Sequence, residues 1–189
     1  MKEQILEPIL RKMRIKQVLP FIQKYDNCHL LDVGCGWEAL LLHELEPYIK
    51  KGVGIDFKAP AIKTAKIETI QASFEKVLPF KNDQFDVVTM LAVLEHLTYP
   101  DLILQEVKRV LKPGGGLILT VPSRYAKPLL EFLAYQVGIV NPEEIADHKR
   151  YFNKVDLVNI LDGVLCVKTH YYFQFGFNNF LFAEKARNL

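Results

Sequence analysis

The stretch HLLDVGCGWEALLLHELEPYIKKGVGIDF, residues 29–57, decides the fold. It opens with an apolar run at residues 30–33, turns at Gly34-Cys35-Gly36, and continues into a leucine-rich segment with the spacing of a helix. A second apolar run at residues 53–55 ends in Asp56. This succession of apolar runs, glycine turn and helical spacing predicts a strand–helix–strand unit.

The glycine turn has the geometry of a ligand site. Gly34 and Gly36 let the backbone turn sharply and approach a ligand closely, and the helix start after them offers unpaired N–H groups to an anion. Asp56 stands 20 residues beyond Gly36, at the carboxyl end of the second strand. A carboxylate in that place can accept hydrogen bonds from both hydroxyls of a ribose. These features indicate a cofactor that contains a nucleoside.

The glycines alone leave two cofactor classes open. The spacing Gly34-x-Gly36-x-x-Ala39 also fits the looser dinucleotide fingerprint, in which alanine can hold the third position. Asp32 separates the two classes, because a negative charge beside a pyrophosphate gains nothing. A cofactor with an ammonium and a sulfonium group tolerates that charge, so Asp32 favours the second class.

The motif LLDVGCG, residues 30–36, resembles the first motif of the class I S-adenosylmethionine (SAM)-dependent methyltransferases. Two later blocks are similar to the same family: LPFKNDQFDVV at residues 78–88 and LKPGG at residues 111–115. The resemblance covers roughly residues 29–185. It implies SAM as cofactor and a Rossmann-like three-layer α/β sandwich, with a seven-stranded, mostly parallel sheet that ends in an antiparallel hairpin.

Sequence periodicity predicts the other elements. A helix is expected at residues 3–19, within an N-terminal helical segment of residues 1–24, and Pro20 should end or kink it. Further helices are predicted at 60–66, 100–112, 127–140 and 154–161, strands at 67–73, 85–91 and 116–121, and a closing hairpin from the runs 165–175 and 177–184.

Composition sets the outer limits of the function. With 189 residues, half of them apolar, the chain is predicted to form a single domain over 1–189. A net charge of +2 gives no strong nucleic-acid signal. Three cysteines without paired spacing fit a cytoplasmic protein without disulfides, and no transmembrane segment or export signal is visible. The expected partner is a small-molecule substrate, and a weak homodimer remains open.

The resemblance assigns cofactor contacts to individual residues. The backbone of Gly34, Cys35 and Gly36 would line the methionine part of SAM, Asp32 would orient that loop, and Asp56 would hold the ribose. Around the adenine and the ammonium, the implied contacts come from Phe57, Ser73, Phe74 and the backbone near Leu91.

The sequence departs from the family pattern at two positions. Glu38 stands where the family usually has its third glycine, and Ser73-Phe74 stands where an acidic residue usually follows the third strand. Both departures concern the strength of cofactor binding more than the fold.

Candidate catalytic residues follow the fifth strand. His148 and Tyr151, in the motif DHKRYF, occupy a region that covers the acceptor pocket in related enzymes, and we predict that they form an acid–base or substrate-orienting pair. Glu95-His96 is a common ending of the fourth-strand motif, where a structural role fits at least as well as a catalytic one. No spacing of histidines and carboxylates suggests a metal.

These observations predict SAM-dependent methyl transfer to an unidentified, small-molecule acceptor. Such a transfer is an in-line displacement that depends mainly on alignment and desolvation, so a dedicated base is needed only for a protonated acceptor. Two alternatives stay open, an NAD(P)-dependent oxidoreductase and a non-catalytic SAM-binding protein.

Overall fold

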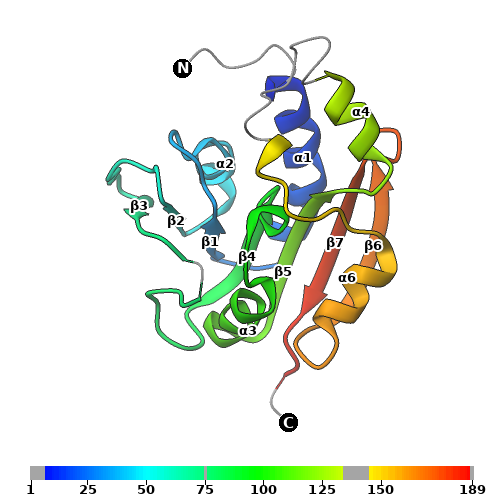
Figure 1. Ribbon diagram of the computed structural model, residues 1–189. Helices are drawn as coiled ribbons and strands as arrows, with labels where there is room; N and C mark the ends of the chain where they lie inside the picture. Colours follow the sequence, from blue (N-terminus) through cyan, green and yellow to red (C-terminus); the bar gives the residue numbers. More distant parts are fainter. Residues whose placement is uncertain (1–6, 75, 134–144, 188–189) are drawn as a thin grey trace.

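The computed structural model of the protein describes residues 7–74, 76–133 and 145–187 (Figure 1). Its seven strands form one sheet in the order β3-β2-β1-β4-β5-β7-β6. The parallel strands are β1 (His29–Val33), β2 (Lys51–Asp56), β3 (Ile67–Gln71), β4 (Phe85–Leu91) and β5 (Leu111–Pro122). Strand β7 (Asn178–Glu184) pairs antiparallel with β5 and with β6 (Cys166–Phe173). The predicted fold class, including the closing hairpin, is confirmed.

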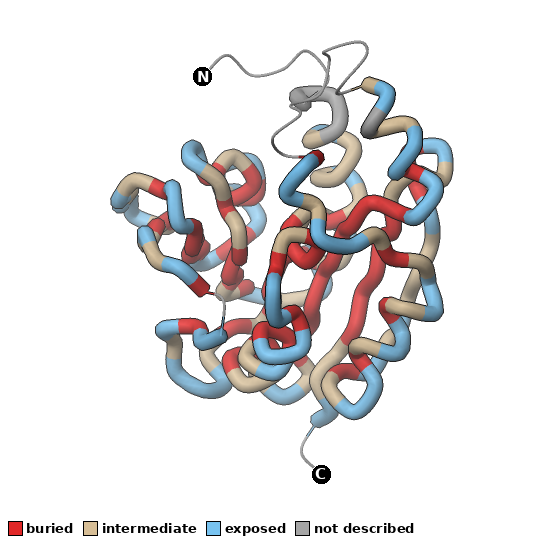
Figure 2. Tube along the Cα trace, viewed as in Figure 1, coloured by how far each residue is buried: buried red, intermediate tan, exposed pale blue. Residues whose placement is uncertain are grey.

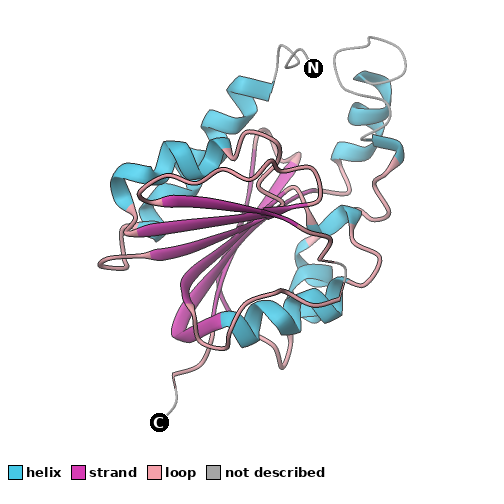
Figure 3. Cartoon of the chain, turned by 90° about the vertical axis from the view of Figure 1, so that its left-hand side faces the viewer, coloured by secondary structure: helices cyan, strands magenta, loops and turns pink. Residues whose placement is uncertain are grey.

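Helices cover both faces of the sheet (Figure 3). Helices α1 (Glu7–Ile22) and α2 (Leu40–Leu45) pack on one face, and α3 (Pro100–Val110) and α6 (Lys154–Leu161) pack on the other. Neighbouring strand residues point to opposite faces, so Leu30 joins the core under α2 while Leu31 joins the core under α3. The remaining elements are α4 (Ala126–Phe132) and the short 3-10 helices η1 (Glu46–Tyr48) and η2 (Leu94–His96).

The central strands are buried on both faces, as their near-continuous apolar runs predict (Figure 2). In β4, Val87 and Val88 are both fully buried although they point to opposite faces. Burial of one such side chain contributes about 1.5–3 kcal/mol to the free energy of unfolding. The layered core therefore holds the carboxyl ends of these strands in a fixed arrangement.

Strand β1 is the point at which the strand order reverses: β2 and β3 are added on one side of it, and β4 and β5 on the other. It pairs with β2 on one side and with β4 on the other, and the chain connections lead away from β1 in opposite directions. In open α/β sheets, ligands bind in the crevice at the carboxyl ends of strands that flank such a switch point. The topology thus places the glycine turn after β1 at the expected ligand site.

The helix predicted at residues 60–66 is wrong. This segment is extended and pairs with β3: the N–H of Thr69 donates to the carbonyl of Ile62 at 2.9 Å, and the N–H of Thr64 donates to the carbonyl of Ile67 at 2.8 Å. The N–H of Ile62 also donates to the Thr69 hydroxyl at 2.7 Å. The free edge of β3 offers backbone partners that outweigh the weak helix preference of the segment, and the pairing covers an exposed sheet edge.

Several element boundaries differ from the predicted ones. Helix α1 continues for two residues beyond Pro20 to Ile22, so the proline lies in its last turn. Strand β5 begins at Leu111, which pairs with Phe85 of β4. Because this pairing starts directly after Val110, α3 ends there, two residues earlier than predicted. Of the helix predicted at 127–140, the structure describes α4, and residues 134–144 lie outside the described residues.

Across the residues that the structure describes, no helix has both the length and the apolar character needed to cross a bilayer.

Candidate functional site

The bend after β1 requires glycine for two reasons. Gly34 and Gly36 have φ values of 78° and 71°, in the left-handed region that L side chains rarely adopt. A Cβ on Gly34 would also lie 2.3 Å from Cγ2 of Val93, whereas a Cβ on Gly36 would meet no atom within 4 Å. The N–H of Gly34 donates to the carbonyl of Ile55 at 2.8 Å, which ties the bend to β2. The outer side of Gly36 is therefore open to an approaching ligand.

Asp56 contacts this bend directly. One carboxylate oxygen, Oδ2, accepts from the N–H of Gly36 at 3.0 Å, and the other, Oδ1, accepts from the N–H of Lys58 at 2.8 Å. Only 8% of the residue is exposed. The structure thus brings together the glycine bend and the acid that the sequence places 20 positions later.

Asp32 lies buried beneath the bend. Its Oδ1 accepts a hydrogen bond from the hydroxyl of Thr89 at 2.7 Å, from the adjacent strand β4. Burial raises the pKa of Asp32 to about 7, and the nearby charge of Asp56 raises the pKa as well, while the Thr89 bond lowers it. Asp32 is therefore close to the point at which a neighbouring cation would make it ionise.

Cys35 contributes to the bend through its backbone. Its Sγ packs on β2, where a Cβ on Gly54 would lie only 2.6 Å from it, and burial raises the pKa of the thiol. The side chain therefore points into the core, and the N–H of Cys35 donates to the carbonyl of Ile55 at 3.3 Å, which further ties the bend to β2.

The residues expected around the adenine and the ammonium have different environments. Phe57 is 60% exposed beside the bend, and Nζ of Lys58 lies 4.8 Å from the centroid of its ring. Ser73 is exposed, whereas Phe74 is buried in the core. Leu91, half-buried, ends β4 next to β1. The structure places Phe57 and Ser73 where a ligand can reach them, and Phe74 beneath the surface.

Glu38, the departure from the glycine pattern, does not occupy the strained position of the loop. The residue with a left-handed backbone before α2 is Ala39, with φ 46°, and Glu38 itself is exposed. The left-handed backbone conformation therefore falls on Ala39, one residue after Glu38, and the Glu38 side chain extends into solvent.

A second group of polar residues gathers after β4. Ala92 has φ 58°, and its N–H donates to the carbonyl of Thr120 in β5 at 2.8 Å. The turn leads into η2, where Glu95 is only 1% exposed and burial raises its pKa to about 8. Neither carboxylate oxygen of Glu95 has a hydrogen-bond partner in the part of the chain that the structure describes. Buried polar groups without partners are rare, so Glu95 requires an explanation.

The predicted pair His148 and Tyr151 is in contact, with Nδ1 of His148 3.2 Å from the tyrosine hydroxyl. The His148 ring also lies edge-to-face on the His96 ring, with the centroids 4.8 Å apart. Burial lowers the pKa of His148 to about 4, and the neighbouring His96 lowers it as well. His148 is therefore neutral at pH 7, which fits a substrate-orienting role better than that of a strong base.

The sequence interpretation named His96 without a partner and did not single out Asp147. Nδ1 of His96 lies 2.8 Å from Oδ2 of Asp147, which immediately precedes His148. The available signal was positional, because LEH follows β4 and DHKRYF follows β5, and adjacent parallel strands end at the same edge of the sheet.

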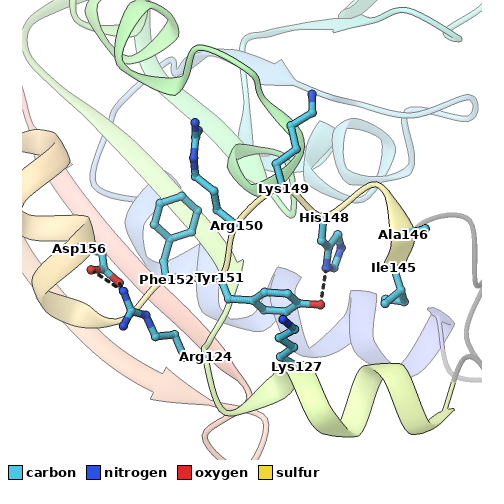
Figure 4. Close-up of a pocket in the computed structure, with 10 residues that line it drawn as sticks. All are labelled: Arg124, Lys127, Ile145, Ala146, His148, Lys149, Arg150, Tyr151, Phe152 and Asp156. Carbon is cyan, nitrogen blue, oxygen red and sulfur yellow. Dashed lines mark hydrogen bonds and ion pairs between the residues drawn. The ribbon is translucent and has the colours of Figure 1, made fainter.

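A cavity of about 780 Å³ lies beside these residues (Figure 4). His148, Tyr151 and Phe152 supply imidazole and aromatic groups to its wall, and Arg124 and Lys127 supply positive charge. Arg124 is paired with Asp156, which also lines the cavity, at 3.0 Å. The aromatic part of this wall offers a surface on which a planar group could pack.

The switch-point bend, the acid after β2 and the antiparallel β7 together define a Rossmann-like domain of the methyltransferase type. Residues 31–119 match the family model described as a methyltransferase domain. Over this region the chain is similar to methyltransferase domains, and its sheet order is that of the class I SAM-dependent methyltransferase fold.

Three known proteins show the extent of this similarity. The demethylmenaquinone methyltransferase of Lactiplantibacillus plantarum is 34% identical over 129 residues, which is 61% of this chain and 54% of that protein. The ubiquinone biosynthesis O-methyltransferase of Nitrosococcus oceani is 33% identical over 140 residues, 68% of this chain and 58% of that protein. The chain thus spans little more than half the length of these relatives. The crystal structure of a SAM-dependent methyltransferase from Aquifex aeolicus shares the fold, with a TM-score of 0.65 and 20% identity over 91% of this chain and 89% of that one.

Proposed function

We propose that the protein transfers a methyl group from SAM to a small molecule with a planar ring. The observation that carries the proposal is the contact between Asp56 and Gly36 at the sheet's switch point, where an open backbone and a carboxylate meet. SAM would supply an electrophilic methyl group. The residues for its site fit the group, because Gly36 leaves room for it and Asp56 and Asp32 provide acceptors for hydroxyl and cationic groups.

The names of the relatives support a ring as the acceptor. Demethylmenaquinone and ubiquinone are quinones, and the two enzymes act on or lead to them. In this chain, Tyr151 and Phe152 border the cavity and offer surfaces for a ring, while His148 offers a hydrogen bond. We therefore propose that His148 and Tyr151 orient the acceptor.

Within the cofactor site, each residue has a separate proposed role. Asp56 binds the ribose, the backbone of Gly34, Cys35 and Gly36 lines the methionine part, and Asp32 interacts with the positive charge. Phe57, Ser73, Phe74 and Leu91 complete the site around the adenine and the ammonium. Alignment of the two reactants accounts for most of the rate enhancement expected from such a site.

The experiment is a methyl-transfer assay with radiolabelled SAM and a panel of hydroxylated quinones, hydroquinones and catechols. We expect labelled product and an equal amount of S-adenosylhomocysteine with at least one compound, and loss of both with Asp56→Ala. Binding of S-adenosylhomocysteine without turnover of any ring compound, or of a cell metabolite extract, would favour the non-catalytic alternative.

A further inference from the structure

We propose that Glu95, His96 and His148 form a binding site for a divalent transition-metal ion of the zinc type. One potential ligand atom from each residue lies within 4.8 Å of the other two. The three residues come from two segments, η2 and the loop before α6, that are 53 positions apart in the chain and are joined where the N–H of Lys149 donates to the carbonyl of Glu95 at 2.9 Å. The cluster is thus a product of the fold.

Both histidines have the surroundings of metal ligands. Nδ1 of His96 lies 2.8 Å from the Asp147 carboxylate, and Nδ1 of His148 lies 3.2 Å from the Tyr151 hydroxyl. With the proton on Nδ1, each ring keeps a lone pair on Nε2. Metal-binding histidines commonly have an oxygen partner at the other ring nitrogen, which fixes the tautomer and the ring orientation. Asp147 and Tyr151 would be such positioning residues.

The environment of Glu95 supports a metal site independently of the two histidines. Its carboxylate is 1% exposed, and neither oxygen accepts a hydrogen bond from any described group. A carboxylate that is buried without a partner is costly, and a bound cation would supply the missing interaction. The positive charge that acts on Glu95 from α1 is Arg14, and Asp147 adds a negative charge beside His96. Nζ of Lys149 donates to the carbonyl of His96 at 2.7 Å, so a divalent ion would bind against the charges of Arg14 and Lys149 and with those of Glu95 and Asp147.

The donor set indicates the class of metal. Two imidazoles and one carboxylate suit zinc and its transition-metal neighbours, whereas magnesium and calcium prefer oxygen ligands throughout. Tetrahedral zinc with bonds of about 2.0–2.1 Å places its ligands about 3.4 Å apart. The ligand atoms lie up to 4.8 Å apart, so their separation would have to shrink by up to about 1.4 Å on binding.

The ion would have a place in the function proposed above, and this part of the inference rests on that function. Three protein ligands leave a coordination position open, as in catalytic zinc sites. His148 also lines the acceptor cavity, so a ring hydroxyl could bind there. A metal-bound hydroxyl loses its proton to solvent more readily. The oxygen would then use its electron pair to bond the methyl carbon, and the sulfur would keep the pair of the broken carbon–sulfur bond.

Metal binding is tested without any acceptor. The protein is stripped with a chelator, dialysed and titrated with Zn²⁺ in a calorimeter, with Mg²⁺ as the comparison. We expect one Zn²⁺ per chain with micromolar or tighter affinity, and binding of Mg²⁺ at least 100-fold weaker. Replacement of zinc by Co²⁺ should give the visible absorption of a site with nitrogen and oxygen ligands.

The variants Glu95→Gln, His96→Asn and His148→Asn should each lose at least tenfold in Zn²⁺ affinity, and Asp147→Asn should lose about 10–100-fold through misorientation of His96. His43→Asn removes an exposed histidine of α2 and serves as the control with unchanged affinity. Circular dichroism and S-adenosylhomocysteine binding show that each variant is folded.

Either of two results overturns the proposal: no Zn²⁺ binding by the folded wild type, or Zn²⁺ binding that is unchanged in all three ligand variants. Because S-adenosylhomocysteine binding is measured on the same samples, failure of the metal site and failure of the proposed function are separate outcomes.

Discussion

The carboxylate of Asp56, at the end of β2, accepts a hydrogen bond from the N–H of Gly36 at 3.0 Å, in the bend that follows β1. In the proposed function, the same carboxylate accepts hydrogen bonds from the ribose hydroxyls. We expect Asp56→Ala to weaken the binding of S-adenosylhomocysteine by more than tenfold, because both the ligand contact and the support of the bend are lost. Isothermal titration measures the change.

The matched control is Glu68→Ala. It removes a carboxylate of β3 that lies away from the bend and forms an ion pair with Lys51, with Nζ and Oε2 3.5 Å apart. Its affinity for S-adenosylhomocysteine should equal that of the wild type. Equal affinity for Asp56→Ala would show that this carboxylate does not hold the ribose.

Gly34→Ala should destabilise the protein far more than Gly163→Ala. Both glycines have left-handed backbones, with φ 78° and 68°, but only the Cβ at position 34 would meet Val93, at 2.3 Å from Cγ2. The left-handed conformation alone costs roughly 1–2 kcal/mol, and overpacking adds about 1–3 kcal/mol. Urea unfolding should therefore give losses of about 2–5 kcal/mol for Gly34→Ala and about 1–2 kcal/mol for Gly163→Ala. Equal losses would mean that Val93 moves aside freely.

Asp32 should make the protein less stable as the pH rises. Its pKa rises from an ordinary value of 3.8 to about 7 in the folded state, so the folded state binds the proton more tightly than the unfolded state does. This contribution is complete below pH 4 and is lost as the pH rises to 7. It amounts to on the order of 4 kcal/mol.

In Asp32→Asn this contribution is absent. The difference in unfolding free energy between wild type and variant, measured in urea at pH 5 and pH 8, should therefore shift against the wild type at pH 8. Glu95, whose pKa is also raised, is present in both proteins and cancels in the difference. A difference that stays the same at both pH values would show that Asp32 ionises normally.

Glu38→Gly should leave S-adenosylhomocysteine affinity unchanged or increase it. The side chain is exposed, and the strained backbone position belongs to Ala39. Glu38→Gln separates the charge from the backbone effect, because it keeps the side-chain size. A large loss of affinity in both variants, measured by the same titration, would assign Glu38 an active part in cofactor binding.

The sequence predicted the sheet well because its signals are local. The apolar runs of β1, β2 and β4 were recognisable one by one, and the glycine turn with Asp56 identified which strands flank the ligand site. The segment 60–66 failed because its conformation depends on the free edge of β3, which no local pattern reveals. Edge pairing through Thr69 outweighed the helix preference.

The parts of the candidate site that are close together in the sequence were predictable, and the contacts between distant segments were not. Asp32, Gly34, Gly36 and Asp56 belong to one continuous unit, and the structure brings them together. The pairing of His148 with Tyr151 was also predicted, since the two residues are only three positions apart. The contact between His96 and Asp147 spans 51 positions and two strand ends, so it became visible only in the folded chain.

The central claim is that the bend and the acid after β2 bind the adenosine of SAM. Calorimetric titration of the wild-type protein with S-adenosylhomocysteine and, separately, with NADH tests it most directly. We expect one molecule of S-adenosylhomocysteine to bind per chain with micromolar affinity, and NADH to bind at least 100-fold more weakly. Tight binding of NADH together with no binding of S-adenosylhomocysteine would contradict the account.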